Sequence, residues 1–334
     1  MVLAAAMREG HRGPVFIQGD HFQGSAAKYK TGPDVEVDAI RTLIEEGLAA
    51  GFFNIDIDTS TLVDLAHPTL DAQQRENYVR AAELAAHVRE HEPDDVTVSV
   101  GGEIGEVGGK NSTVEELTAY MDGFNRTLGE LGRGYVGLSK ISVQTGTSHG
   151  GVVLPDGSIA QVKLDLEALK SLSAAASKKY HMGGAVQHGA STLPEEAFVS
   201  FPKFGACEIH LATNFQNMVF DHPKLPADIR DGYKRWVIEN CASERKAGDS
   251  EQQFIYKSRK KAIGPFKRQM WEMPRATLDA ISADLEKTFG FLFDRLNIGG
   301  TADVVARYVK APVLRHSAPQ PVAMAAPDDA EAGE

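Results

Sequence analysis

Four side chains that could bind a metal ion stand at regular intervals along the chain. They are His21, Glu103, His149 and His188, separated by 82 residues (21 to 103), 46 (103 to 149) and 39 (149 to 188). Asp58 divides the first interval into 37 and 45 residues (21 to 58, 58 to 103), so each step is close to one β/α unit. Each follows a short apolar run, as residues at the mouth of a parallel β/α barrel do. Three imidazoles and a carboxylate there predict a site for zinc or a similar divalent ion.

Alternating strands and helices would position these residues, and this alternation predicts a parallel sheet. The periodicity predicts strands at 15–19, 52–58, 96–100, 138–143, 185–187 and 207–211, with the main helices at 35–50, 71–90, 113–131 and 164–180. A capping box from Ser112 to Glu115 is expected to begin the third of these helices. Asp20 and His21 are neighbours at the end of the first strand and are expected to face opposite sides of it.

Six short motifs resemble, in order, those of the metal-dependent class II fructose- and tagatose-bisphosphate aldolases. They are Gly19-Asp20-His21, Ile57-Asp58-Thr59-Ser60, the GGEIG-containing run that ends at Gly109, Gly146-Thr147-Ser148-His149-Gly150, His188-Gly189-Ala190-Ser191 and His210-Leu211-Ala212-Thr213-Asn214. Each motif alone is weak, whereas six in the family's order at barrel spacing are specific. The resemblance covers residues 14–222 and is not expected to reach the last hundred residues.

The fold class expected from the motifs and their spacing is α/β, a TIM-type β/α barrel at residues 1–225. Six predicted strands fall short of the eight of a closed barrel, and by family position the first two are missing. We therefore expect either a truncated start or an open barrel covered by a neighbouring subunit. Charged amphipathic helices predict a helical extension at 226–316, and a Pro-, Ala- and acid-rich composition predicts a disordered tail at 317–334.

The resemblance also implies an activity, the reversible aldol cleavage of a ketose bisphosphate such as fructose 1,6-bisphosphate to dihydroxyacetone phosphate and an aldehyde. By family position His21, His149 and His188 would be ligands of Zn²⁺ or another divalent metal. Glu103 would be a further or moving ligand, and Asp58 a carboxylate near the metal. This chemistry needs a Lewis acid on the carbonyl, which such a metal supplies.

The remaining site residues are implied in the same way. Asp20 matches the acid/base that exchanges a proton with the C4 hydroxyl, and His210 stands where an Asn usually contacts the enediolate. Backbone amides and small polar side chains near the last strands would bind the substrate's phosphate. The candidates by family position are Gly150, Gly189, Ser191, Thr213 and Asn214.

Departures from the family pattern leave two other interpretations open. The loop after Gly109 lacks an acidic pair and His210 replaces an Asn, which favours a noncatalytic aldolase-like subunit. Alternatively, Lys140 lies in a predicted strand and could form a Schiff base if desolvated.

Structural roles are the expected interpretation for other groups. Asn54, Asp56 and Asp58 share one strand face and could form a hydrogen-bonded polar layer. His87, His91 and five other histidines outside the motifs are expected to be structural or surface groups. The basic, aromatic segment 256–268 is expected to pack as helices, with a substrate-facing loop as the alternative.

Composition narrows the range of partners. The 334 residues carry a net charge of −11 and no long basic stretch, which argues against nucleic acid. No run of the sequence is apolar enough to span a membrane. The two cysteines, Cys207 and Cys241, show no pairing pattern and indicate a reducing, cytoplasmic compartment. The expected partners are a sugar phosphate and further copies of the chain in a homo-oligomer.

Overall fold

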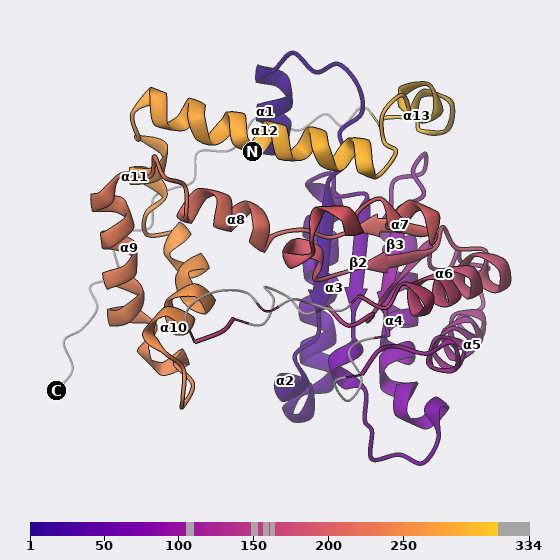
Figure 1. Ribbon diagram of the computed structural model, residues 1–334. Helices are drawn as coiled ribbons and strands as arrows, with labels where there is room; N and C mark the ends of the chain where they lie inside the picture. Colours follow the sequence, from indigo (N-terminus) through magenta and orange to yellow (C-terminus); the bar gives the residue numbers. More distant parts are fainter. Residues whose placement is uncertain (105–109, 148–152, 156–159, 161–163, 313–334) are drawn as a thin grey trace, which may run out of the picture.

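The computed structural model describes residues 1–104, 110–147, 153–155, 160 and 164–312. Within that part, six parallel strands form one sheet in which neighbours along the chain are neighbours in space. The sheet curves into a half-barrel (Figure 1). The strands are β1 (Gln18–Gln23), β2 (Asn54–Asp58), β3 (Ser99–Glu103), β4 (Lys140–Val143), β5 (Ala185–Gln187) and β6 (Ala206–Ile209). The predicted α/β fold with six parallel strands is confirmed, but the described residues do not close an eight-stranded barrel.

Helices alternate with the strands and cover the outer face of the half-barrel (Figure 1). They are α3 (Pro33–Ala49), α4 (Leu70–His91), α5 (Val114–Glu130), α6 (Leu166–Tyr180) and α7 (Ser200–Lys203), and the short α2 (Ala26–Thr31), which buries no residue, lies beyond the end of β1. The main core lies between these helices and the strands, where Ile44, Ile55, Leu84 and Phe124 are fully buried. Each such side chain contributes roughly 1.5–3 kcal/mol through burial, so this core fixes the strands against the helices.

The strand β1 contains one extra residue relative to β2. Gly19 pairs with Ile55 and Phe22 with Ile57, so three steps on β1 oppose two on β2. His21 lies within this bulge with a φ of 53°, and bulges of this kind re-aim side chains. The expectation that Asp20 and His21 face opposite sides was wrong, because His21 Nε2 lies 3.7 Å from Asp20 Oδ2.

The start of α5 also differs from the expectation. Thr113 is the N-cap, and it forms the capping box with Glu116 rather than Ser112 with Glu115. The hydroxyl of Ser112 instead accepts a hydrogen bond from the Gln144 amide at 2.9 Å. The residue that caps the helix is therefore decided by a contact beyond β4, not by the local pattern.

The C-terminal part is helical and has a hydrophobic cluster of its own. Fully or nearly fully buried side chains in it include Phe220, Tyr233, Val237 and Phe254. No described helix has the combined length and apolarity needed to cross a membrane. The helices outside the half-barrel are α1 (Val2–Arg8), α8 (Thr213–Phe220), α9 (Ala227–Asn240), α10 (Glu251–Ser258), α11 (Lys267–Trp271), α12 (Arg275–Arg295) and α13 (Ala302–Tyr308).

The basic segment 256–268 packs within this second cluster through Arg259. The Arg259 guanidinium donates to both carboxylate oxygens of Asp221, at 2.6 and 2.8 Å, and to Asn217. It also lies over the Tyr256 ring. A bidentate, nearly buried Arg of this kind ties α8 to the following helices, which favours the packing interpretation over a substrate-facing loop.

The long helix α12 joins the two clusters. Its Ile281 belongs to the C-terminal cluster and its Leu292 to the main core. Near its C-terminal end, Phe291 meets Phe198 edge to face, with ring centroids 6.5 Å apart. In Figure 1, α12 runs from the C-terminal helices across to the half-barrel. Its end therefore reaches the side of the half-barrel that carries β6.

Candidate active site

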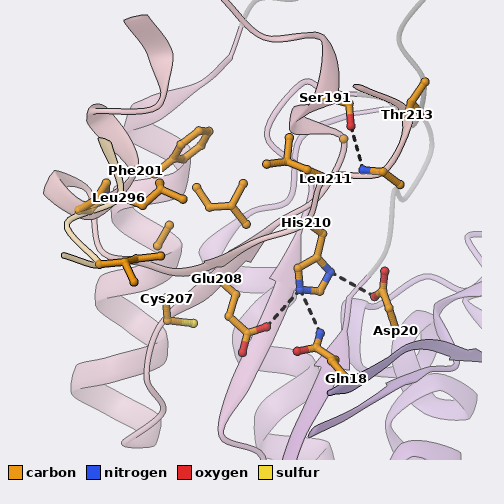
Figure 2. Close-up of a pocket in the computed structure, with 16 residues that line it drawn as sticks. Gln18, Asp20, Ser191, Phe201, Cys207, Glu208, His210, Leu211, Thr213 and Leu296 are labelled. Atoms are coloured by element: carbon orange, nitrogen blue, oxygen red, sulfur yellow. Dashed lines mark hydrogen bonds and ion pairs between the residues drawn. The ribbon is translucent and has the colours of Figure 1, made fainter. Parts of the chain in front are cut away.

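Two neighbouring cavities open where the strands end. The smaller, about 280 Å³, is lined by His21, Asp58, Glu103 and His188 among others. The larger, about 580 Å³, holds the polar side chains Gln18, Asp20, Ser191, Glu208, His210 and Thr213 (Figure 2). Gly189 lines both. A site at the carboxyl ends of parallel strands is where β/α barrels carry their chemistry, so we treat the two cavities as one candidate site.

The smaller cavity gathers possible metal ligands around His21. Its Nδ1 lies 3.1 Å from Asp58 Oδ2 and 3.5 Å from Glu103 Oε2. The His188 ring meets the His21 ring edge to face, with centroids 4.7 Å apart. One ligand atom from each of His21, Asp58 and Glu103 lies within 4.8 Å of the others, as is true for Asp20, His21 and His188. His149 and Gly150, predicted as a ligand and a phosphate contact, lie outside the described residues.

The electrostatics of this cluster favour a cation. Burial, followed by the charge of Asp58, raises the pKa of Glu103 to about 8. The hydrogen bond to Asp58 raises the pKa of His21 to about 9 against the effect of burial. Glu103 and His21 therefore bind protons readily, and these protons offset the negative charge of the carboxylates in the cluster. A divalent ion would take the place of those protons, so the donor set fits such an ion.

Glycine residues in β3 leave room for the site and for its supporting helix. A Cβ on Gly101 would lie 2.3 Å from Asp56 Oδ1, inside the half-barrel. One on Gly102 would lie 2.7 Å from the Tyr120 hydroxyl of α5, on the outer side. The sequence Gly-Gly-Glu thus lets β3 lie close to Asp56 on the inner side and to α5 on the outer side, while Glu103 at its end reaches the mouth.

A buried amide on α4 holds the ends of β2 and β3 together. Asn77 is fully buried, and its Nδ2 donates to the Glu103 carbonyl and to Gln74 Oε1, both at 2.9 Å. Its Oδ1 accepts from Thr59 Oγ1 at 2.7 Å. Since Thr59 follows Asp58 directly, this network sets the spacing of the two strand ends that carry Asp58 and Glu103. Sequence reasoning missed Asn77, because nothing in the helical pattern separates it from a surface residue.

In the larger cavity three polar side chains surround His210, whose ring can donate to the carboxylates of Asp20 and Glu208, whereas the Gln18 amide nitrogen is itself a donor (Figure 2). Its Nδ1 lies 3.1 Å from Asp20 Oδ1, and its Nε2 lies 3.1 Å from both Glu208 Oε2 and Gln18 Nε2. Burial lowers the pKa of His210, but its hydrogen bonds to Asp20 and Glu208 outweigh burial and raise it to about 9. Partial burial raises the pKa of Asp20, and the contact with His210 brings it down to about 2. The pair is therefore an imidazolium next to an ionised carboxylate.

Below the mouth, Lys140 occupies the interior of the half-barrel. Its ammonium donates to Glu208 at 2.7 and 2.8 Å and to Gln18 Oε1 at 3.0 Å. Asp56 Oδ1 lies 3.0 Å away. A Schiff-base nucleophile must be free to attack a carbonyl, whereas the Lys140 nitrogen already donates to Glu208 and Gln18 and lies against Asp56. The predicted polar layer is thus divided, with Asp56 facing Lys140 and Asp58 facing His21.

The predicted phosphate contacts come together only in part. Gly189, Ser191 and Thr213 line the larger cavity, and Asn214 is not among its lining residues. The hydroxyl of Ser191 accepts from the Ala212 amide at 3.1 Å, which joins the turn after β5 to the start of α8 (Figure 2). Three lining residues and a helix start therefore surround one end of this cavity.

Gln18, Asp56 and Glu208 were not predicted as site residues. The sequence does carry a signal for two of them. Asp56 alternates with Asp58 and so lies on the same strand face, and Glu208 differs from the residue that is common at this position in the family. For Gln18 no local signal exists, since an amide at a strand start is common. All three contact Lys140, and they meet there only because the fold brings strands that are far apart in the sequence around this side chain.

Comparisons with known proteins bear on the family and on the fold. The family described as fructose-bisphosphate aldolase class-II matches residues 1–281. The match continues into the helical extension, so the expected end of the resemblance near residue 222 was wrong. No curated protein matches the sequence.

Two solved structures show the fold. A probable tagatose 6-phosphate kinase from Sinorhizobium meliloti 1021 is 16% identical, with 92% of this chain and 80% of that chain covered and a TM-score of 0.55. A fructuronate-tagaturonate epimerase from Cohnella laeviribosi is 11% identical, with coverages of 88% and 70% and a TM-score of 0.58. The structural likeness bears on the fold, and the family follows from the sequence match. Because that match spans residues 1–281 of 334, the chain belongs to the class II fructose-bisphosphate aldolase family.

Proposed function

We propose that this protein is a lyase that cleaves a ketose phosphate, such as fructose 1,6-bisphosphate, by a reversible aldol reaction at a divalent-metal site. The observation that carries the proposal is the convergence of His21, Glu103 and His188 in one cavity, next to the Asp20–His210 pair in the other. This reaction needs a metal site next to a pair of groups that can transfer a proton.

The metal would be held by His21, Glu103 and His188, with His149 added by family position and Asp58 supporting His21. Members of this family generally depend on a divalent metal, and imidazole with carboxylate suits zinc and neighbouring transition metals. When bound, the cation would act as a Lewis acid toward the ketose carbonyl.

Asp20 would take the proton of the C4 hydroxyl. As that proton leaves, its bonding electrons form the aldehyde C=O, and the electron pair of the C3–C4 bond stays with the ketose half. The imidazolium of His210, 3.1 Å from Asp20 Oδ1, would keep Asp20 ionised and oriented for this transfer. In the reverse direction Asp20 would return the proton to the new hydroxyl.

One phosphate of the substrate would bind at the start of α8. Ser191 and Thr213 line that end of the larger cavity, and among the described residues that line either cavity none is a Lys or an Arg. Recognition would therefore rest on hydroxyls and on the amides of Gly189 and of the first turn of α8, where the helix dipole favours an anion.

The test measures metal content and fructose 1,6-bisphosphate cleavage in the purified chain, before and after chelation. His188→Ala should lose both metal at this site and cleavage, and re-added zinc should restore cleavage only to the wild type. His67→Ala, an exposed histidine in a loop, serves as the matched control and should behave like the wild type.

Two other outcomes would redirect the proposal. Metal binding without cleavage of any ketose phosphate would favour another reaction of a ketose, such as the epimerisation named for the Cohnella protein. Absence of metal at the mouth even with excess zinc would leave the noncatalytic aldolase-like subunit as the better account.

A further inference from the structure

A second group of possible metal ligands lies outside the candidate active site, on the outer helices. His87 and His91 are four residues apart on α4, and Glu45 lies on α3 beside them. One ligand atom from each lies within 4.8 Å of the other two. Residues at i and i+4 share one helix face, one turn apart, so both imidazoles face the same side as Glu45.

The distances within this group fit the first shell of one ion. His87 Nε2 lies 3.0 Å and His91 Nε2 lies 3.8 Å from the same oxygen, Glu45 Oε1. Ligands about 2.0–2.1 Å from a tetrahedral zinc ion lie about 3.3 Å from one another. Small side-chain rotations are therefore enough to bring three ligands around an ion, which leaves the fourth position for water.

The hydrogen bonds also prepare the ligands. His91 Nδ1 lies 2.9 Å from the His87 carbonyl oxygen, and donation to that carbonyl leaves the Nε2 lone pair of the neutral ring directed at Glu45. Such a bond to the second ring nitrogen is a common way to fix the tautomer of a metal ligand. His87 Nε2 is hydrogen-bonded to Glu45 Oε1 at 3.0 Å, and a bound ion would take the place of the proton between them.

The nearby charges do not oppose an ion. Arg41 is the one Lys or Arg in α3, and its guanidinium is paired with Asp38 at 2.8 Å. Glu90, next to His91 in sequence, is also paired, with Arg133 at 3.0 Å and with the Tyr135 hydroxyl at 2.6 Å. The Glu45 side chain is about half exposed (51%) and that of His91 is 41% exposed, so an ion can enter from solvent.

We propose that Glu45, His87 and His91 form a peripheral site for a divalent transition metal such as zinc, which links α3 to α4. Two imidazoles and one carboxylate select zinc, nickel or copper over magnesium and calcium. The site stands on its own residues and does not depend on the proposed aldol reaction.

Zinc titration of the full chain tests the site, with calorimetry and metal analysis on the wild type, His91→Ala, His188→Ala and the double variant. The wild type should bind two equivalents, and His91→Ala should lose one while cleavage of fructose 1,6-bisphosphate is unchanged. Glu45→Gln should weaken the peripheral affinity at least tenfold. Zinc should raise the Tm of His188→Ala but not that of the double variant.

Failure of this site and failure of the proposed function give different results. If the mouth binds no metal, the wild type binds one equivalent, which His91→Ala abolishes and His188→Ala does not. If His91→Ala and His87→Ala, both folded by circular dichroism, bind zinc with the stoichiometry and affinities of the wild type, the peripheral site does not exist.

Discussion

Replacement of Lys140 by methionine tests how the interior of the half-barrel is held together. The Lys140 side chain is only 3% exposed and meets Glu208 at 2.7 Å and Asp56 at 3.0 Å. Methionine keeps most of the volume but leaves two carboxylates without their shared cation. Removing one partner of a buried ion pair costs about 3–5 kcal/mol, and burial already raises the pKa of Asp56 with the lysine present.

The loss should be measurable as a lower melting temperature. An unfolding entropy of about 2.1 cal/mol/K per residue amounts to roughly 0.7 kcal/mol/K for 334 residues. Lys140→Met should therefore lower Tm by about 4–7 °C in differential scanning calorimetry. Lys179→Met is the matched control, because Lys179 pairs with Asp122 at 3.4 Å on the surface, and exposed pairs contribute about 0–1 kcal/mol.

A second set of variants separates charge from packing. Adding Asp56→Asn and Glu208→Gln to Lys140→Met removes the uncompensated charges and should recover most of the lost stability. In a parallel experiment, borohydride reduction of the wild type in the presence of fructose 1,6-bisphosphate should leave no sugar adduct on Lys140. An unchanged Tm for Lys140→Met, together with substrate-dependent trapping on Lys140, would refute the structural role and restore the Schiff-base mechanism.

Two further substitutions, each with a control variant, test the helices behind the site. Gly123→Ala should lower the free energy of unfolding by about 1–3 kcal/mol in urea titrations despite the higher helix propensity of alanine, because its Cβ would lie 2.4 Å from the buried Tyr78 ring. Gly129→Ala, in the same helix with nothing within 4 Å, should instead be neutral or stabilise by up to about 1 kcal/mol, and equal effects of the two would contradict this packing. Asn77→Ala should cost about 2–3 kcal/mol by leaving the Glu103 carbonyl unpaired and should weaken zinc binding at the mouth. Gln73→Ala is the control, because Gln73 lies one helical turn before Asn77 and donates to the His67 carbonyl in a loop. This variant should leave the zinc affinity unchanged. A similar loss of affinity in both variants would argue against a positioning role for Asn77.

Much of the fold follows from local patterns. A period of two in Phe52 to Asp58 and a period of 3.6 in the helix after it determine element type, because each element must bury one side. The order of six strands and their parallel arrangement follow from that alternation. The motifs lie at strand ends for the same reason, since an apolar run buried between helices must end where polar groups reach water. His21, Asp58, Glu103 and His188 could thus be assigned to one mouth before any contact was known.

The tertiary structure decided which side chains are partners at the mouth. Asp56 and Asp58 carry the same local signal, yet one meets Lys140 and the other His21, because sheet register places them in different layers of the half-barrel. The bulge in β1 brings Asp20 and His21 to the same side, which a strict two-residue period forbids. Local periodicity specifies only the side that a residue faces. Its partner depends on pairings between distant strands, such as those that bring Glu208 to Lys140 across 68 residues.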